Sequence, residues 1–402
     1  MAVTPRFSVE QRRIRLARRH HLATETAALD VHTVARQMVG LHATDPATVY
    51  LSARRRVPGF EVAHLEAALY DHRLLQRHMG VRRTMFTLPI DLVPMVQAAA
   101  SDPIGRAVRT RLVKELEHAG IGGADGATCS DWLDATIDAT VGALVELGPS
   151  TGSQLSAAVP QLRTKLTSGN LDAAVTTRVL TLMALEGRVV RDRPTGSWTS
   201  SLHRWRPAEA VAAGPLDRMV ATTDLVDRWL RAFGPAPVDD IVWWTGLGLT
   251  KVRAALIALA AVTVDLDGEA GIVRPGVALA NDVEPDPPVS PWVALLPSLD
   301  PTPMGWKTRD WYLGEHTGAL FDRTGNIGPT VWSNGRIIGG WSQRRSEPGV
   351  PGGEVRFRIF DDVGAEVIAA VTAEAASLQQ WLGSVVVSPR FPTPTDVALR
   401  GV

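Results

Sequence analysis

Apolar residues in the N-terminal part of the chain recur every three or four positions, which predicts a series of helices. The segments with this spacing are 9–22, 30–41, 47–56 and 61–76. Asp30, and later Asp45 followed by Pro46, are typical helix start signals for the second and third segments. A strand is predicted at 81–88. The last three of these helices followed by a strand give the order of a winged helix, so we predict such a module over 1–118.

A repeat in the middle of the chain supports two further modules of the same kind. Leu147-Gly-Pro149 and Phe233-Gly-Pro235 each follow a predicted helix. Each precedes a short helix, a longer helix and strand-like residues around a turn; Asp267-Gly268 is a strong hairpin signal in the second copy. This order predicts tandem winged helix-turn-helix modules over 127–213 and 214–284, separated from the first by the glycine-rich residues 119–126.

The last quarter of the chain has a different pattern. A proline-rich stretch, 285–291, leads into short strand-like runs with turn signals such as Asn334-Gly335, and a helix at 366–383 is expected to close the chain. This predicts a β-rich, barrel-like domain over 292–402. The predicted fold class is therefore α+β, with three tandem winged helix-turn-helix modules followed by a C-terminal β-rich domain.

The composition of the chain argues against several classes of protein. No apolar run reaches the roughly 20 residues of a membrane span and no apolar signal core follows the N-terminus, so we expect a cytoplasmic protein without membrane contact. The single cysteine, Cys129, excludes an intramolecular disulfide and a cysteine metal cluster. The paired histidines lack further ligands around them, and no phosphate-binding or dinucleotide fingerprint is present. We therefore expect neither a metal nor an organic cofactor.

The charge is unevenly distributed although the chain is neutral overall. Residues 1–115 contain 18 Arg and Lys against 10 Asp and Glu, while the whole chain has 42 of each. A basic surface of this kind is typical of a protein that binds a polyanion such as DNA. A solvated basic helix explains the same charges equally well. The candidates for phosphate contact are Arg18, Arg19, Arg54, Arg55, Arg56, Arg82 and Arg83.

A cluster of polar residues stands between two predicted helices, at Leu41-His-Ala-Thr-Asp-Pro46. Asp45 is accounted for by capping the helix that begins at Pro46. Local structure does not require His42, although a histidine near a helix end is often a packing residue or a partner of the helix dipole. Thr44 could cap the same helix. In an extended segment His42 and Thr44 would point the same way, whereas on a helix they would diverge.

Several motifs resemble those of the winged-helix DNA glycosylases of the AlkZ and YcaQ type. The matching stretches are Leu41–Thr44, Arg82–Phe86, Leu296-Pro-Ser-Leu-Asp-Pro301 with Met304-Gly305, and Asn334-Gly-Arg336 with Gly339-Gly-Trp341. The resemblance implies a monofunctional DNA glycosylase that removes N7-alkylated or bulky purines from duplex DNA, acts without a cofactor and is a monomer. The family pattern has Gln-x-Gln or Gln-x-Asp where this chain has His42 and Thr44.

The chemistry of base removal suits these residue types. A sugar with oxocarbenium character must be attacked by water, and a neutral imidazole at His42 can accept the proton of that water while Thr44 holds it. Asp45 could orient the imidazole or face the sugar cation. The alternative is a winged-helix DNA-binding protein without catalysis, a transcriptional regulator or a lesion sensor, in which these residues have no catalytic role.

Overall fold

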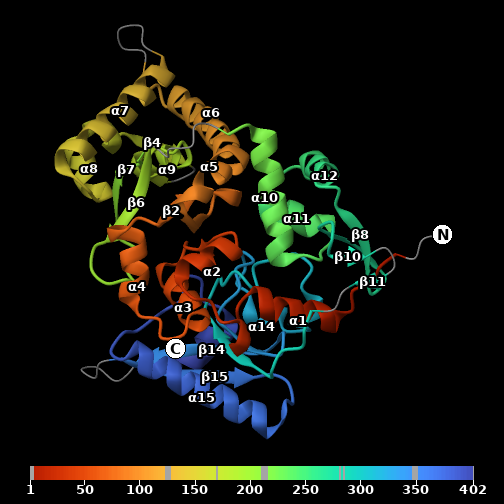
Figure 1. Cartoon of the computed structure of the whole chain (residues 1–402). Helices are drawn as coiled ribbons and strands as arrows, with labels where there is room; N and C mark the ends of the chain where they lie inside the picture. The colour runs from red at the N-terminus through yellow and green to blue at the C-terminus, as the bar shows by residue number, and fades with distance from the viewer. Residues whose placement is uncertain are drawn as a thin grey trace. The chain divides into compact units, whose positions relative to one another are not determined.

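The computed structural model shows a mixed helical and stranded chain that divides into two compact units. One consists of residues 1–68 together with 223–402, and the other of residues 69–222. Helices and strands occur in both, so the α+β class is confirmed (Figure 1). The structure describes residues 4–122, 128–168, 171–209, 216–279, 282–283, 286–345 and 352–401. The predicted linkers at 119–126 and 285–291 lie partly outside them.

The first three N-terminal helices form where the apolar spacing predicts them, although α2 ends before Leu41, which lies in a short strand; the fourth differs more. The four helices are α1 Val9–Arg19, α2 Val31–Gln37, α3 Pro46–Arg56 and α4 Val62–Glu66. The predicted helix 61–76 is only partly present. It ends in a π-helical turn at Ala67–Asp71, and the chain then continues as strand β2, so the prediction is wrong for the last residues of this segment. Leu75, the first residue of β2, is buried and pairs with Pro89 of β3, so sheet pairing overrides the helical spacing there.

The boundary predicted at residue 118 does not separate compact units. Helix α3 belongs to the same unit as the C-terminal residues, to which its polar side chains are bonded. Thr48 Oγ1 donates to the carbonyl of Ser298 over 2.7 Å, and Arg54 pairs with Glu374 over 2.6 Å. Strand β3, which lies within the segment predicted as the strand of the first module, belongs to the other unit together with the unexpected β2. Residues 1–118 are therefore divided between the two units, after residue 68.

The unit 69–222 contains an antiparallel sheet in which β3, β2, β6 and β7 are neighbours in that order. Its helices follow the first predicted repeat, with a hairpin of β4 and β5 inserted before the last helix, which the sequence did not indicate. The elements are β2 Leu75–Met79, β3 Met85–Pro89, α5 Val93–Val96, α6 Asp102–His118, α7 Cys129–Leu147, α8 Gly152–Ala158, β4 Lys165–Ser168, β5 Leu171–Ala174, α9 Thr176–Leu185, β6 Val189–Pro194 and β7 His203–Pro207.

The second predicted repeat has the expected order of elements. Helices α10 Arg218–Phe233, α11 Val238–Thr245 and α12 Leu249–Ala258 precede the hairpin of β8 Val262–Leu266 and β9 Glu269–Val273. The turn residues Asp267 and Gly268 have φ of 56° and 100°, the left-handed values that an Asp-Gly hairpin turn requires. The hairpin prediction is confirmed. Among the described residues, no single helix is long and apolar enough to span a membrane. Helices α11 and α12 together have the length and composition of a span, but the chain bends by 116° between them.

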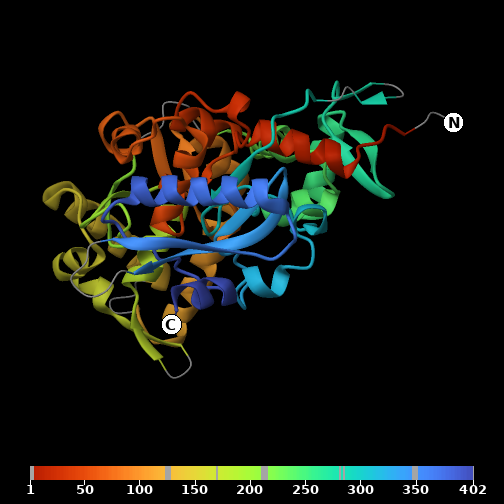
Figure 2. The same cartoon turned by 90° about the horizontal axis from the view of Figure 1, so that it is seen from below.

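The C-terminal residues form an open sheet, so the barrel-like prediction is wrong. Strands β12 Val293–Leu296, β13 Thr330–Ser333, β14 Arg336–Arg345 and β15 Gly353–Ile359 pair antiparallel in that order, and β12 is not paired with β15. Helix α15 Gly364–Leu382 lies along the sheet against the two edge strands, β12 and β15 (Figure 2). It does not close the chain, since α16 Pro394–Arg400 follows and packs on β14.

An aromatic cluster joins the end of α10 to the short helix α13 Asp310–Leu313 and to the chain that precedes it; a second short helix, α14 Thr317–Leu320, follows. Trp306 is at its centre, with ring centroids 5.3 Å from Phe233 and 5.1 Å from Trp311, both edge to face. The Trp306 indole N–H donates to the carbonyl of Phe233. Buried aromatic pairs of this kind combine a large apolar area with a fixed orientation, so the cluster fixes the turn after α10.

Candidate functional site

The polar motif lies in a short connection between two helices. After α2 the chain turns through Val39 and Gly40, whose φ values are 55° and 98°, and the next two residues, Leu41–His42, form strand β1. Helix α3 begins only at Pro46. His42 and Thr44 therefore both precede the helix, so the divergent, helical alternative for this pair does not apply.

The two residues differ in their surroundings. The His42 side chain is 5% exposed, and Ala43 between the two is fully buried. Thr44 is partly exposed, yet its Oγ1 atom is shielded from solvent and has no hydrogen-bond partner among the residues that the structure describes. A hydroxyl in this condition retains its full capacity to donate to or accept from a ligand. Thr44 does not cap α3.

Asp45 is committed to structure through both carboxylate oxygens. Oδ1 accepts from the backbone N–H of Ala47 over 3.1 Å, which caps α3, and Oδ2 accepts from the backbone N–H of Arg390 over 3.0 Å. Burial raises the pKa of Asp45, while the two hydrogen bonds and the charge of Arg390 act in the opposite direction. The capping interpretation is confirmed, and the carboxylate also holds the C-terminal segment.

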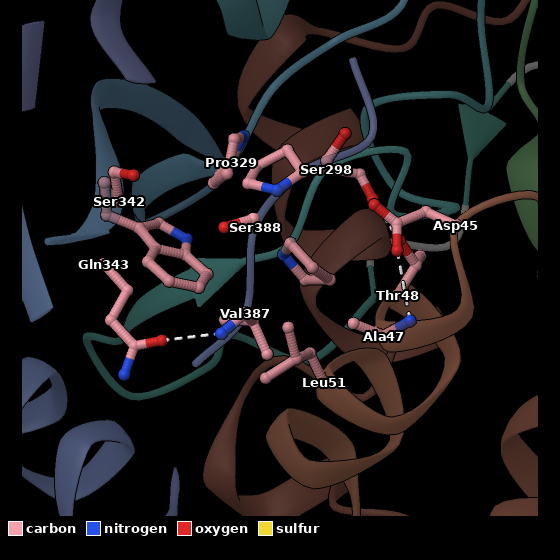
Figure 3. A pocket seen from close by; sticks show the side chains of 13 residues that line it. Asp45, Ala47, Thr48, Leu51, Ser298, Pro329, Ser342, Gln343, Val387 and Ser388 are labelled. Atoms are coloured by element: carbon pink, nitrogen blue, oxygen red, sulfur yellow. Dashed lines mark hydrogen bonds between the residues drawn. The ribbon is translucent and has the colours of Figure 1, made fainter. Parts of the chain in front are cut away.

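A narrow pocket opens beside this aspartate, with room for a water molecule (Figure 3). Asp45 and Thr48 stand on one side, and Ser342 and Gln343 of β14 on the other. Gln343 Oε1 accepts from the backbone N–H of Val387 over 2.8 Å. The pocket places polar groups from both ends of the chain next to the connection that carries His42 and Thr44.

Three of the predicted phosphate-contact arginines on α3 are engaged by the protein itself. Arg56 is fully buried and donates to both oxygens of Asp300, over 2.9 and 2.7 Å, so the prediction of a phosphate contact is wrong for this residue. Arg55 donates to the carbonyls of Leu22 and Val293, and burial lowers its pKa to about 10. Arg54 is bonded to Glu374 and Ser377.

The buried pair of Arg56 and Asp300 is a feature that the sequence did not identify. Asp300 also accepts from Ser52 Oγ over 2.6 Å and from the backbone N–H of Thr302 over 2.9 Å. Burial alone would raise its pKa, but the charge and hydrogen bonds of Arg56, with those of Ser52, lower it. The Leu296–Pro301 motif therefore builds a turn, as predicted for Asp300, and also anchors α3.

The remaining arginines of the prediction lie in different surroundings. Arg19 donates to the carbonyl of Gly234 over 2.8 Å, and burial lowers its pKa to about 10, whereas Arg18 is partly exposed. In the other unit, Arg82 and Arg83 follow β2 with φ of 52° and 59°. Left-handed backbone is costly for residues other than glycine and concentrates at functional sites. Arg83 is exposed, so its side chain is accessible to a ligand.

A metal-binding arrangement is not found in the described part of the chain. No three His, Cys, Asp or Glu side chains come together there in a way that could hold an ion. His20 instead contacts Thr302 Oγ1 through Nδ1 and the carbonyl of Ala232 through Nε2. Burial, followed by the charge of Arg56, lowers the pKa of His20 to about 3, which keeps its imidazole neutral.

Comparison with known proteins identifies the class to which this fold and site belong. The chain superposes on the DNA glycosylase AlkZ of Streptomyces sahachiroi with a TM-score of 0.68 at 16% sequence identity, covering 95% of this chain and 98% of that one, so the two share a fold. The family model described as DNA glycosylase AlkZ-like matches residues 35–381. The protein is thus a DNA glycosylase. It belongs to the AlkZ-like DNA glycosylase family, as its motifs indicated. No curated protein sequence matches it.

Family membership also decides between the two functions that the sequence left open. A DNA glycosylase is an enzyme of DNA repair that binds DNA. The alternative of a regulator without catalysis is therefore set aside. The matched range 35–381 includes the connection with His42 and Thr44, the two Arg82–Arg83 positions and the C-terminal sheet.

Proposed function

We propose that this enzyme hydrolyses the N-glycosidic bond of N7-alkylated or bulky purines in duplex DNA, with His42 and Thr44 as the reacting pair. The observation that carries the proposal is the difference between the hydrogen bonds of Asp45 and those of Thr44. Both oxygens of Asp45 are used by backbone N–H groups, whereas the buried hydroxyl of Thr44 has no partner among the described residues. Thr44 therefore keeps its hydroxyl for chemistry, and it stands with His42 at the positions that resemble the family's catalytic pair.

The charge of the leaving base explains how two residues can be enough to catalyse its release. A purine alkylated at N7 already carries positive charge, so the C1′–N9 bond breaks with its electron pair going to the base and no strong general acid is needed. Water then forms the new bond to C1′ and transfers a proton to the imidazole of His42, while Thr44 Oγ1 orients the same water. The products are the free base and an abasic site, with the DNA strand intact.

Binding of duplex DNA is assigned to the helix and hairpin modules. The series of α10, α11, α12 and the β8–β9 hairpin is the order of a winged helix, and α7 to β7 has the same order with an inserted hairpin. With the N-terminal helices these would make the three modules expected from the sequence. The exposed Arg83 next to a strained turn is the best-placed phosphate contact in the predicted set. We propose that the enzyme acts as a monomer and needs no metal or organic cofactor.

A panel of duplexes tests this substrate class. Purified enzyme is incubated in excess over duplexes that carry one 7-methylguanine, one bulky N7-guanine adduct or unmodified guanine at the same position, and free base is quantified over time. We expect release from at least one modified duplex well above spontaneous depurination, and none from unmodified guanine. Release at only the spontaneous rate from both modified duplexes contradicts the proposed substrate class.

A further inference from the structure

The unit 1–68 with 223–402 contains a small pocket that the glycosylase chemistry does not use. It lies between α1, the turn that follows α10 and α13, and has room for a single water-sized particle. Its lining side chains are those of Arg12, Arg15, Leu16, Ala232, Phe233, Pro235, Trp306 and Trp311, together with Gly234. The Phe233-Gly-Pro235 turn, noted in the sequence as part of a repeat, forms one wall.

Hydrogen-bond donors are in excess around this pocket. Arg12 and Arg15 are 6% and 5% exposed, and Trp311 is 8% exposed. Four buried nitrogen atoms on these residues have no hydrogen-bond partner among the described residues: Nε and one terminal nitrogen of Arg12, one terminal nitrogen of Arg15 and Nε1 of Trp311. Buried polar groups in native proteins are nearly always paired, so four unpaired donors around one pocket require an explanation.

The wall of the pocket offers these donors little to bind. None of the lining side chains carries an acceptor, because they are arginine, tryptophan or apolar residues. The carbonyls at the turn each accept a hydrogen bond already: Ala232 from His20, Phe233 from the indole of Trp306 and Gly234 from Arg19. A water molecule in the pocket could accept only two of the four free N–H groups, and its own two O–H groups would have only the second lone pairs of these carbonyls as acceptors.

The electrostatic balance also favours a negative particle. The Arg12 guanidinium lies over the Trp311 ring at 4.2 Å, and burial lowers the pKa of Arg12 to about 10, partly offset by Asp240. Asp286 accepts from Arg15 Nε. Asp240 Oδ1 accepts from the backbone N–H groups of Lys307 and Thr308, and its buried Oδ2 makes no hydrogen bond to Arg12 or to any other described residue. Arg12 is therefore a buried cation without a bonded counter-ion, which is costly unless compensated.

We infer that this pocket is a binding site for a small monatomic anion of the size and charge of chloride, held by Arg12, Arg15 and the indole N–H of Trp311. Such an ion accepts hydrogen bonds from every direction, balances the guanidinium of Arg12 and fits where a phosphate or carboxylate group does not. It connects α1 to the turn after α10 and to α13. The site is independent of the proposed base-release chemistry, which involves none of these residues.

The test compares chloride with a bulky anion. Thermal unfolding of the full chain is followed while chloride replaces gluconate at constant ionic strength and pH, conditions under which nonspecific screening stays the same. The midpoint of the wild type should rise by about 3 °C once chloride is in tenfold excess over its dissociation constant. Trp311→Phe, which keeps an aromatic ring and removes only the N–H donor, should reduce the response, and Arg12→Met should abolish it.

A charge-matched control and a direct observation complete the test. Arg18→Met removes an arginine from the same helix at a partly exposed position and should leave the chloride response intact. In crystals grown with bromide in place of chloride, an anomalous peak should lie in this pocket in the wild type and be missing in Arg12→Met. Absence of the peak in the wild type, or an equal chloride response in wild type, Arg12→Met and Trp311→Phe, overturns the proposal.

Discussion

Arg56 and Asp300 form a two-pronged ion pair in which both side chains are fully buried, with nitrogen to oxygen distances of 2.9 and 2.7 Å. The pair joins α3, which follows the connection with His42 and Thr44, to the turn between β12 and α13. Because neither charge has access to water, each depends on the other for compensation. The position of the connection before α3 consequently rests on this contact.

Removing one member of the pair should destabilise the protein strongly. Asp300→Asn leaves the Arg56 guanidinium buried without a counter-charge, and we expect a loss of about 3–5 kcal/mol in the free energy of unfolding, measured with urea. Arg54→Met, which breaks the more exposed pair with Glu374, serves as the control and should cost about 1 kcal/mol or less. Equal losses in the two variants would contradict the special role of the buried pair.

Asp45 should act on stability and not on chemistry. Asp45→Ser preserves an N-cap oxygen and should retain base release, whereas Asp45→Ala should lose about 0.5–2 kcal/mol of stability with the rate for the folded enzyme retained. Asp30→Ala, which removes the cap of α2 through Thr33, is the matched control for stability. A folded Asp45→Ser variant that no longer releases base would show that the carboxylate takes part in catalysis.

Acid should destabilise the unit that contains His20. Its pKa is about 3 in the folded chain and near 6.5 when unfolded, so between these values the unfolded chain binds the additional proton and the free energy of unfolding falls as pH falls. The expected contribution approaches about 1.4 kcal/mol per pH unit across that window. Urea titrations at pH 7, 6 and 5 should show a weaker pH dependence in His20→Gln; an unchanged dependence would disprove this assignment.

The exposed Arg83 should contribute to DNA binding through charge alone. Arg83→Gln is expected to weaken the binding of any duplex and to lower the slope of log K against log salt concentration by about 0.9 for one lost phosphate contact. Fluorescence anisotropy at several salt concentrations measures this slope. Lys114→Gln, a basic residue outside the predicted contact set, is the comparison. If Arg83→Gln and wild type have the same slope, Arg83 does not contact phosphate.

Much of the helical framework could be predicted because its signals are local. The Asp30 and Asp45-Pro46 start signals mark the beginning of α2 and α3, and Asp267-Gly268 forms the expected hairpin turn. The hairpin at Asn334-Gly335 was also predicted correctly. Each of these features depends on a few neighbouring residues, so it is visible without knowledge of the rest of the fold.

Features that depend on distant partners were missed. The basic run Arg54–Arg56 suggested a phosphate-binding surface, yet Arg56 faces Asp300, 244 residues away in the sequence. Arg12 and Arg15, three positions apart on α1, are buried, although in the sequence they cannot be told from exposed arginines. The strand at Leu75–Met79 and the open C-terminal sheet likewise depend on pairing between separate segments. Local spacing carries no information on such partners.

The central claim is that His42 takes the proton of the attacking water, and single-turnover base release tests it most directly. Rates for wild type and His42→Ala are compared on a duplex with one 7-methylguanine, after both proteins are shown to have equal unfolding midpoints and equal affinity for that duplex. We predict that the His42→Ala rate falls by roughly 100-fold or more, as expected when a general base is lost. A His42→Ala rate equal to that of the wild type would contradict the account.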